Sequence, residues 1–394
     1  MSTPSRTVYL DHAATTAVDP RVVEAMVPYF SEHYGNPSSI YRLAETARAG
    51  LQGARETVAE ILGARPGEII FTSCGTESDN LALRGVAWAR RSQGRHLIIS
   101  PIEHHAVDYT ADQLAREYGY AVTRVPVDAH GLVDPDAVGR AITAETALVS
   151  VMYANNEVGT IEPIAEIARI AHARGVLVHT DAVQAGGTLD LNVDRLGVDL
   201  LSLSGHKFYA PKGVGVLYVR SGTPLLPTQT GGGQERQRRA GTENVPYIVG
   251  LATALKLAYD MAEDENRRLE LLRDRLVAGV LSAIPAAHLT GHRTQRLPNN
   301  ASFVLDGVDG EALLLHLDLA GVAASSGSAC ASSEEGPSHV LAAMGISPAQ
   351  ARGSLRLSLG RENSVQDVDY VLGTLPGIVH TLREMSPLYA GPAA

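Results

Sequence analysis

Residues 147–181 read ALVSVMYANNEVGTIEPIAEIARIAHARGVLVHTD, a strand, a helix and a second strand in immediate succession. The runs 147–151 and 176–179 are short and rich in Val and Leu, as strands buried on both faces are. Between them, over residues 163–174, apolar side chains recur at helical spacing: Ile164, Ile167, Ala168 and Ala171. Strands that alternate with helices predict a parallel sheet covered by crossover helices.

The rest of the chain extends this pattern. Further buried strands are predicted at 68–72, 96–100 and 199–202, and an antiparallel one at 213–219. A long charged helix follows over 260–284, with one apolar stripe formed by Leu269, Leu272, Leu276 and Val280. Strands near 301–305 and 354–359 then indicate a smaller α+β unit.

The predicted fold class is therefore α/β, with a large domain whose mostly parallel sheet is covered by helices, and a smaller α+β domain. A chain of 394 residues exceeds the size at which one core keeps growing, so two domains are expected. We assign residues 16–260 to the large domain, and residues 1–15 with 261–394 to the small one.

Composition and charge argue against a nucleic-acid-binding, a membrane or a secreted protein. A net charge of −10 and a pI near 5.8 give no electrostatic reason to approach nucleic acid or an anionic membrane. Residues 1–10 contain no apolar signal region, and no stretch is long enough to span a bilayer, so a cytoplasmic protein is expected. Two cysteines in such a chain indicate thiols rather than a disulfide framework.

Cys330 lies in the small-residue run 325–333, SSGSACASS. A lone cysteine is more often a small buried hydrophobe, but a flexible polar stretch favours an accessible, reactive thiol. Cys74 lies between a predicted buried strand and a helix start, where a poorly solvated thiol packs well, so we expect it to be dispensable. Lys207, in the run Ser204-Gly205-His206-Lys207 directly after a buried strand, is a second reactive group.

Ligands of open α/β sheets bind at the carboxyl ends of the strands. After strand 68–72, Gly75 and Thr76 open a helix and would suit a phosphate, although a helix cap explains them equally well. Asp181 ends another strand, where an Asp is commonly a turn former. His104 and His105 are adjacent in sequence and do not converge on one ion, so we predict no metal site.

One cofactor, pyridoxal 5'-phosphate, would use the phosphate turn, the Asp and the Lys together. Its ring is an electron sink only while the pyridine nitrogen is protonated, which requires a carboxylate partner such as Asp181. Its aldehyde carbon binds a lysine held beside it, and Lys207 is the predicted attachment point.

The chain resembles the cysteine desulfurases of the nitrogenase and iron-sulfur-cluster type, in the class V aminotransferase group of fold-type I pyridoxal-phosphate enzymes. The ordered motifs run nearly end to end, at residues 9–16 (YLDHAATT), 35–39 (GNPSS), 103–107 (EHHAV), 155–159 (NNEVG), 179–184 (HTDAVQ), 204–207 (SGHK), 239–244 (RAGTEN), 326–330 (SGSAC) and 356–361 (RLSLGR).

The resemblance implies a role for each matching residue. Gly75, Thr76, Ser204 and His206 would cradle the cofactor phosphate, and Thr242 would reach the phosphate of the other subunit of a homodimer. Asp181 would hold the pyridine nitrogen, Gln184 and Asn155 the ring hydroxyl, and His104 would stack on the ring and shuttle protons. Arg356, with Asn36 and Asn155, would bind the substrate carboxylate.

The implied reaction converts L-cysteine to L-alanine and leaves a persulfide on Cys330, whose sulfur passes to an acceptor such as an iron-sulfur scaffold. The protein would hold no metal of its own, although Cys330 could transiently ligate a cluster held by a partner. Four residues depart from the family pattern: Tyr41, Ala44, Cys74 and Ala210. Two alternatives stay open, a class V aminotransferase or selenocysteine lyase, which would not need Cys330, and a non-catalytic scaffold for sulfur transfer.

Overall fold

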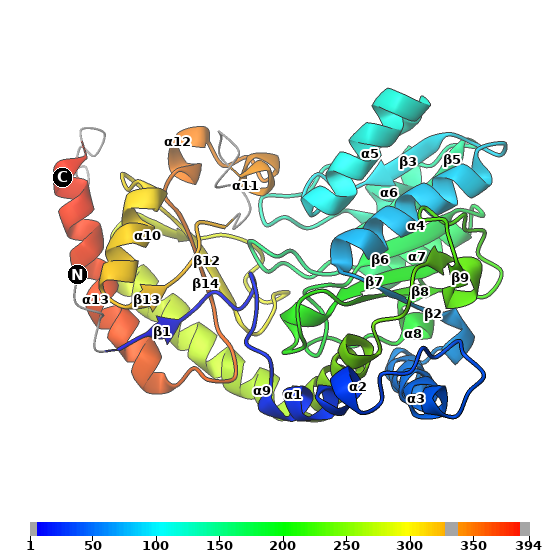
Figure 1. The fold of residues 1–394 in the computed structure, drawn as a ribbon. Coiled ribbons are helices and arrows are strands. Elements are labelled where there is room, and N and C mark those ends of the chain that lie inside the picture. Colours follow the sequence, from blue (N-terminus) through cyan, green and yellow to red (C-terminus); the bar gives the residue numbers. More distant parts are fainter. Residues whose placement is uncertain (1–5, 328–337, 387–394) are drawn as a thin grey trace.

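The computed structural model describes residues 6–327 and 338–386. It shows two bodies joined by one long helix, α9 (Figure 1). We call them the large lobe, which holds a seven-stranded sheet, and the small lobe, which holds a three-stranded sheet. Cys330 lies outside the described residues.

The sheet of the large lobe confirms the predicted class. Its strand order is β2 (Ile69–Thr72), β8 (Gly215–Val219), β7 (Leu200–Ser204), β6 (Leu177–Asp181), β5 (Thr146–Ser150), β3 (His96–Ile99) and β4 (Ala121–Arg124). Strands β7, β6, β5, β3 and β4 run parallel, and β8 is antiparallel to both of its neighbours, as predicted for residues 213–219. The edge strand β4 was not predicted, because it is partly exposed and lacks a buried apolar run.

Helices cover both faces of this sheet (Figure 1). On one face α4 (Gly75–Arg90) and α5 (His105–Tyr118) contribute Leu81, Val107 and Leu114 to a core with the strands. On the other face lie α3 (Leu43–Leu62), α6 (Pro135–Ala141) and α7 (Ile164–His172). The helix predicted at 163–174 is confirmed as α7, and the four apolar side chains that predicted it are all buried.

Helix α9 (Val245–Ala283) corrects the prediction of a helix that begins at residue 260. It begins 15 residues earlier, where the side chain of Asn244 accepts a hydrogen bond from the Tyr247 amide. The apolar first half, which includes Leu251, packs into the core of the large lobe, and the second half, which includes Leu276, packs into that of the small lobe. The first half therefore lacks the charged, one-striped pattern by which the helix was predicted.

The small lobe is built on the antiparallel sheet β11 (Ala287–Leu289), β12 (Asn300–Leu305) and β14 (Ser354–Ser358). Helices α10 (Gly310–Leu319) and α13 (Val365–Met385) pack on it. The N-terminal strand β1 (Val8–Tyr9) joins this lobe by pairing with β13 (Val322–Ala323). The predicted domain limits stay a prediction, but the two cores separate midway along α9.

The remaining described elements are short. They are α1 (Pro20–Met26), α2 (Pro28–Ser31), α8 (Val193–Leu196), α11 (His339–Ala343), α12 (Pro348–Ala351), the strands β9 (Gly233–Gln234) and β10 (Arg239–Ala240), and the 3-10 turns η1 (Pro66–Glu68), η2 (Gly205–Lys207) and η3 (Glu235–Gln237). Among the described residues, no helix combines the length and hydrophobicity needed to cross a membrane. The same residues contain no cluster of three or more side chains suited to hold a metal ion.

Candidate functional site

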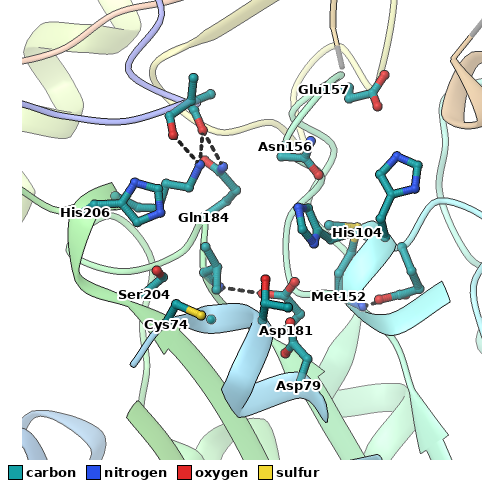
Figure 2. A pocket seen from close by; sticks show the side chains of 18 of the residues that line it. Cys74, Asp79, His104, Met152, Asn156, Glu157, Asp181, Gln184, Ser204 and His206 are labelled. Atoms are coloured by element: carbon teal, nitrogen blue, oxygen red, sulfur yellow. Dashed lines mark hydrogen bonds between the residues drawn. The ribbon is translucent and has the colours of Figure 1, made fainter. Parts of the chain in front are cut away.

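A cavity of about 270 Å³ lies where the parallel strands of the large lobe end. Residues that follow β2, β3, β5, β6 and β7 form most of its wall (Figure 2). The small lobe closes it with Arg356 of β14 and His339 of α11, and the N-terminal segment adds Ala13 and Ala14. The site therefore depends on both lobes.

One end of the cavity is shaped to hold an anion. Gly75 and Thr76 form the first turn of the 16-residue helix α4, whose N-terminal amides attract negative charge. Ser204 and His206 line the same cavity. A Cβ atom on Gly75 would lie 2.8 Å from Val183 Cγ2 and 3.2 Å from Ser204 Cβ, so only glycine fits this close approach.

Cys74 precedes this turn and differs from its predicted surroundings. It caps α4, with Sγ accepting a hydrogen bond from the Glu77 amide at 3.5 Å. The side chain lines the cavity and is only half-buried, so the expectation of a poorly solvated thiol is wrong. As the cap of α4, Cys74 lies in the cavity wall instead of in a core.

Three buried carboxyl groups line the cavity floor: Asp79, Glu103 and Asp181 (Figure 2 labels the first and the last). Burial raises the pKa of Asp181 to about 6, and Lys207 opposes this rise. Burial also raises the pKa of Glu103 to about 8. Burial and the nearby Asp181 raise the pKa of Asp79 well above its usual value. At neutral pH the cavity floor therefore carries one main negative charge, on Asp181.

The imidazoles of His104 and His206 are neutral. Burial and Lys207 lower the pKa of both to about 4. In His104, Nδ1 accepts a hydrogen bond from the Ala106 amide at 3.1 Å, so the ring proton lies on Nε2. His104, which lines the cavity, can therefore donate a hydrogen bond only from Nε2.

Lys207 and Arg356 supply the positive charges. Lys207 Nζ donates to the carbonyl oxygens of Ala13 and Ala14 at 2.5 and 2.7 Å. Arg356 is 1% exposed, and within the described parts of the chain its buried Nε has no hydrogen-bond partner. An unpaired buried donor at a cavity wall indicates a site for an acceptor group.

Residues 8–371 match the family model for class V aminotransferases. The chain is 53% identical to a cysteine desulfurase IscS of Methanosarcina thermophila over 388 residues, which cover 98% of this chain and 96% of the relative. The chain belongs to the cysteine desulfurase family.

Further relatives agree. A cysteine desulfurase of Gluconacetobacter diazotrophicus is 48% identical over 98% of this chain and 97% of its own length. A solved NifS-like protein superimposes with a TM-score of 0.90 at 40% identity, and covers 95% of this chain and all of its own. A structure titled SspA in complex with cysteine gives a TM-score of 0.79 at 37% identity, over 90% of this chain and 99% of that one.

The residues of the cavity fit pyridoxal 5'-phosphate, the cofactor of this family. The N-terminus of α4 suits its phosphate, and the Asp181 carboxylate, with a pKa of about 6, can be charged at neutral pH to hold a protonated ring nitrogen. Lys207 Nζ lies in the same cavity as the anion site and Asp181. The fit thus rests on three different groups of the protein.

The structure brings most predicted site residues together in this one cavity: Gly75, Thr76, His104, Asp181, Gln184, Ser204, His206, Lys207 and Arg356. Asn155 is fully buried beside it, with its amide bonded to Ile102 and to the amides of Glu157 and Val158, and its neighbour Asn156 lines the wall. Asn36 and Thr242 are exposed and are not among the described lining residues. Their roles stay predictions.

Other lining residues were not predicted to belong to the site. The carbonyls of Ala13 and Ala14 and the ring of His339 approach the cavity only because the small lobe closes over it. Glu103 and Asp79 carry a signal in the sequence, because both follow the carboxyl end of a buried strand. In the sequence, however, each is explained equally well as a residue at the start of a helix.

Glu103 provides a pH test of the cavity floor. Its pKa is raised from 4.5 to about 8, so the stability it contributes is full below pH 4.5 and is lost as pH rises toward 8. Glu103→Gln keeps the shape but cannot ionise. We therefore expect the melting temperature of the variant, relative to wild type, to rise by a few degrees between pH 5 and 8. The expected change in stability is a few kcal/mol, and 1 kcal/mol shifts the melting temperature of a chain of this size by about 1 °C.

The matched control is Glu263→Gln, which changes an exposed side chain of α9 and should show no such trend. The other buried carboxyls are common to both proteins and cancel in the difference. A melting-temperature difference for Glu103→Gln that does not change with pH would show that Glu103 ionises normally.

Proposed function

We propose that the protein is a pyridoxal-phosphate-dependent cysteine desulfurase that converts L-cysteine to L-alanine and keeps the sulfur on Cys330. One observation carries this proposal: Lys207, Asp181 and Arg356 converge on one cavity from the two lobes. A lysine, a carboxylate for the ring nitrogen and a guanidinium for the substrate carboxylate are the groups that amino-acid chemistry with this cofactor requires.

When bound, the cofactor supplies the electron sink that labilises bonds at the substrate Cα. Lys207 Nζ holds the cofactor and moves the Cα proton. Arg356 binds the substrate carboxylate with its unpaired Nε. His104 offers only Nε2–H, because Nδ1 accepts from the Ala106 amide, so the neutral ring donates a hydrogen bond from Nε2 and presents no free basic nitrogen.

Cys330 takes the sulfur. Its thiolate attacks the substrate sulfur, the bond between Cβ and sulfur breaks, and Cβ receives a proton. The balance is one thiol and one L-cysteine to one persulfide and one L-alanine, so no external oxidant or reductant is needed. This role rests on the sequence, because Cys330 lies outside the described residues.

The purified protein provides the test. Its visible absorption should show bound cofactor and change when L-cysteine is added. With a thiol reductant present, L-alanine and sulfide should form in equal amounts. A colourless protein that does not bind the cofactor would favour a scaffold, and formation of a keto acid instead of alanine would favour an aminotransferase.

A homodimer completes the proposed enzyme. The segment 23–43 exposes a row of large apolar side chains, among them Phe30, Tyr34 and Ile40, the last of which is fully exposed. Such a patch indicates a protein interface. A second copy of the chain is the occupant we propose, because Thr242 lies outside its own cavity and would be used by a partner.

The loop that carries Thr242 lies beside this patch. Gln234 at its start is 2.9 Å from Ser38 Oγ, and Arg239 pairs with Glu77 of α4 at 2.8 Å. Residues 235–237 adopt positive φ angles of 42°, 55° and 64°, a costly conformation that is held by a buried, bidentate Arg55–Glu235 ion pair. A rigid loop next to an apolar patch is suited to present Thr242 to a docked subunit.

Mixed dimers test the shared site. Thr242→Ala should weaken cofactor binding, and Lys207→Ala should be inactive. When the two variants are mixed and allowed to exchange subunits, each heterodimer contains one site with both an intact Lys207 and a partner's intact Thr242. We expect activity to return to as much as a quarter of wild type in an equal mixture, measured as alanine formation.

The single variants, incubated alone, are the controls for that recovery. Recovery should also require dimers in sedimentation. A fully active monomer, or a mixture no more active than the sum of its parts, would contradict the shared site.

We further propose a cytoplasmic location, where thiols stay reduced, and an iron-sulfur assembly scaffold as the acceptor of the sulfur.

A further inference from the structure

The hydrogen bonds of Arg356 leave part of its guanidinium group unused. Of its five N–H donors, the two on Nη1 are taken by Asn156 O at 2.8 Å and Gly327 O at 2.7 Å. One on Nη2 is taken by Asp11 Oδ1 at 2.8 Å. Within the described residues, Nε has no partner. Nε–H and one Nη2–H therefore remain for a ligand.

The unused donors suit a carboxylate. Nε and Nη2 lie on the same edge of the planar guanidinium and can bind both oxygens of one carboxylate. Arg356 lines the cavity and is almost fully buried, so an unfilled Nε is costly unless a ligand completes it. Which edge faces the cavity depends on the groups that hold Nη1 and Nη2.

Among those groups, Asp11 contributes the one side chain. Its carboxylate contacts Arg356, and Asp11 is not among the described residues that line the cavity. Its backbone is fixed: residue 11 forms a parallel bridge with Ser358 of β14, and its carbonyl accepts from the Tyr9 hydroxyl and the Ala14 amide, both at 3.0 Å. Asp11 is thus a rigid anchor next to the strand that carries Arg356.

We propose that Asp11 is a positioning residue that turns the Nε edge of Arg356 toward the carboxylate of the substrate. The inference rests on the proposed function and adds a residue to it. An arginine side chain has many rotamers, and without Asp11 its Nη2 would lose the only side chain that fixes it within the described structure. The same contact lowers the electrostatic attraction of Arg356 for an anionic ligand, because the negative charge of Asp11 neutralises part of it.

The orienting effect and the charge effect of Asp11 predict opposite changes in ligand affinity when Asp11 is replaced. Asp11→Asn removes the charge but keeps an oxygen that accepts from Nη2, whereas Asp11→Ala removes both. If Asp11 orients Arg356, affinity for a carboxylate ligand survives in Asp11→Asn and falls in Asp11→Ala. If Asp11 is only a counter-charge, both variants bind the ligand more tightly.

The experiment measures binding by isothermal titration calorimetry in the holoenzyme with Cys330→Ala, so that sulfur is not transferred. The ligands are L-cysteine and cysteamine, which lacks the carboxylate. We expect Asp11→Ala to weaken L-cysteine binding by about 10-fold or more, as displaced positioning groups do. Asp11→Asn should stay within about 3-fold of the parent, and cysteamine affinity should change by less than about 2-fold in both variants, since only the carboxylate contact is lost.

Two further variants complete the design. Asp369→Ala breaks an exposed ion pair with Arg275 in the same lobe and should leave both ligands unaffected. Arg356→Gln should weaken L-cysteine binding, and adding Asp11→Ala to it should have no further effect, because the two residues act as one unit.

The possible results distinguish a failure of the proposed Asp11 role from a failure of the proposed function. If Arg356→Gln weakens binding and Asp11→Ala does not, the carboxylate site stands and the role of Asp11 is wrong. If Asp11→Ala weakens both ligands equally, Asp11 is structural and the inference is also wrong. Failure of the proposed function itself would appear independently, as the absence of alanine and sulfide in the protein with native Cys330.

Discussion

Lys207→Ala is expected to abolish multiple turnover while leaving a folded protein. In the proposed mechanism the side chain holds the cofactor and moves the substrate proton, and losing a positioned proton-transfer group alone costs about 10²–10⁴-fold in rate. We therefore expect alanine formation to fall by at least about 10³-fold. The measurement is alanine produced per subunit over many cycles, with circular dichroism to verify the fold.

A neighbouring lysine serves as the control. Lys212 is exposed and does not line the cavity, so Lys212→Ala should retain wild-type activity. The anion site and Asp181 are untouched in Lys207→Ala, so the variant should still bind the cofactor non-covalently. Sustained turnover by Lys207→Ala at a tenth of the wild-type rate would refute the assignment of this lysine.

Cys330→Ser should separate substrate binding from sulfur transfer. In the proposed mechanism the binding of L-cysteine depends on Lys207 and Arg356 and not on Cys330, so the visible spectrum should still change when the substrate is added. A serine hydroxyl is a far weaker nucleophile than a thiolate at neutral pH, and we expect desulfuration to fall by about 10³-fold or more. Alanine and sulfide formation report the loss.

The second cysteine is the matched control for that experiment. Cys74→Ala removes a weak cap of α4 and should cost only about 0.5–1 kcal/mol of stability while it keeps most of the activity. After treatment with L-cysteine, mass spectrometry should find the added sulfur on the peptide of Cys330. Because Cys74 Sγ lines the cavity, sulfur found on Cys74 instead would overturn the mechanism.

Much of the fold was predictable from local pattern. The strands of the large sheet are buried on both faces and therefore appear as short runs of Val, Leu and Ile, and the exposed edge strand β4 leaves no such run. The start of α9 was missed for a related reason. Its first half is buried in the large lobe and its second half is amphipathic, so one helix carries two patterns.

Part of the site was predictable because parallel strands place their carboxyl ends on one edge of the sheet. Asp181 ends one buried strand, His206 and Lys207 follow another, and the structure brings the three to one cavity. The resemblance to a family supplied Arg356, which the strand pattern alone would leave as a polar residue between leucines.

The sequence by itself thus determined the class of fold and the chemical groups, since both follow from the order of residues along single strands and helices. Only the tertiary structure decided which groups are charged and where they point. Burial raises the pKa of Glu103 to about 8 and leaves Asp181 at about 6, a difference that depends on surrounding atoms rather than neighbours in sequence. Asp11 meets Arg356 across 345 positions, because β1 and β14 are built into the same lobe.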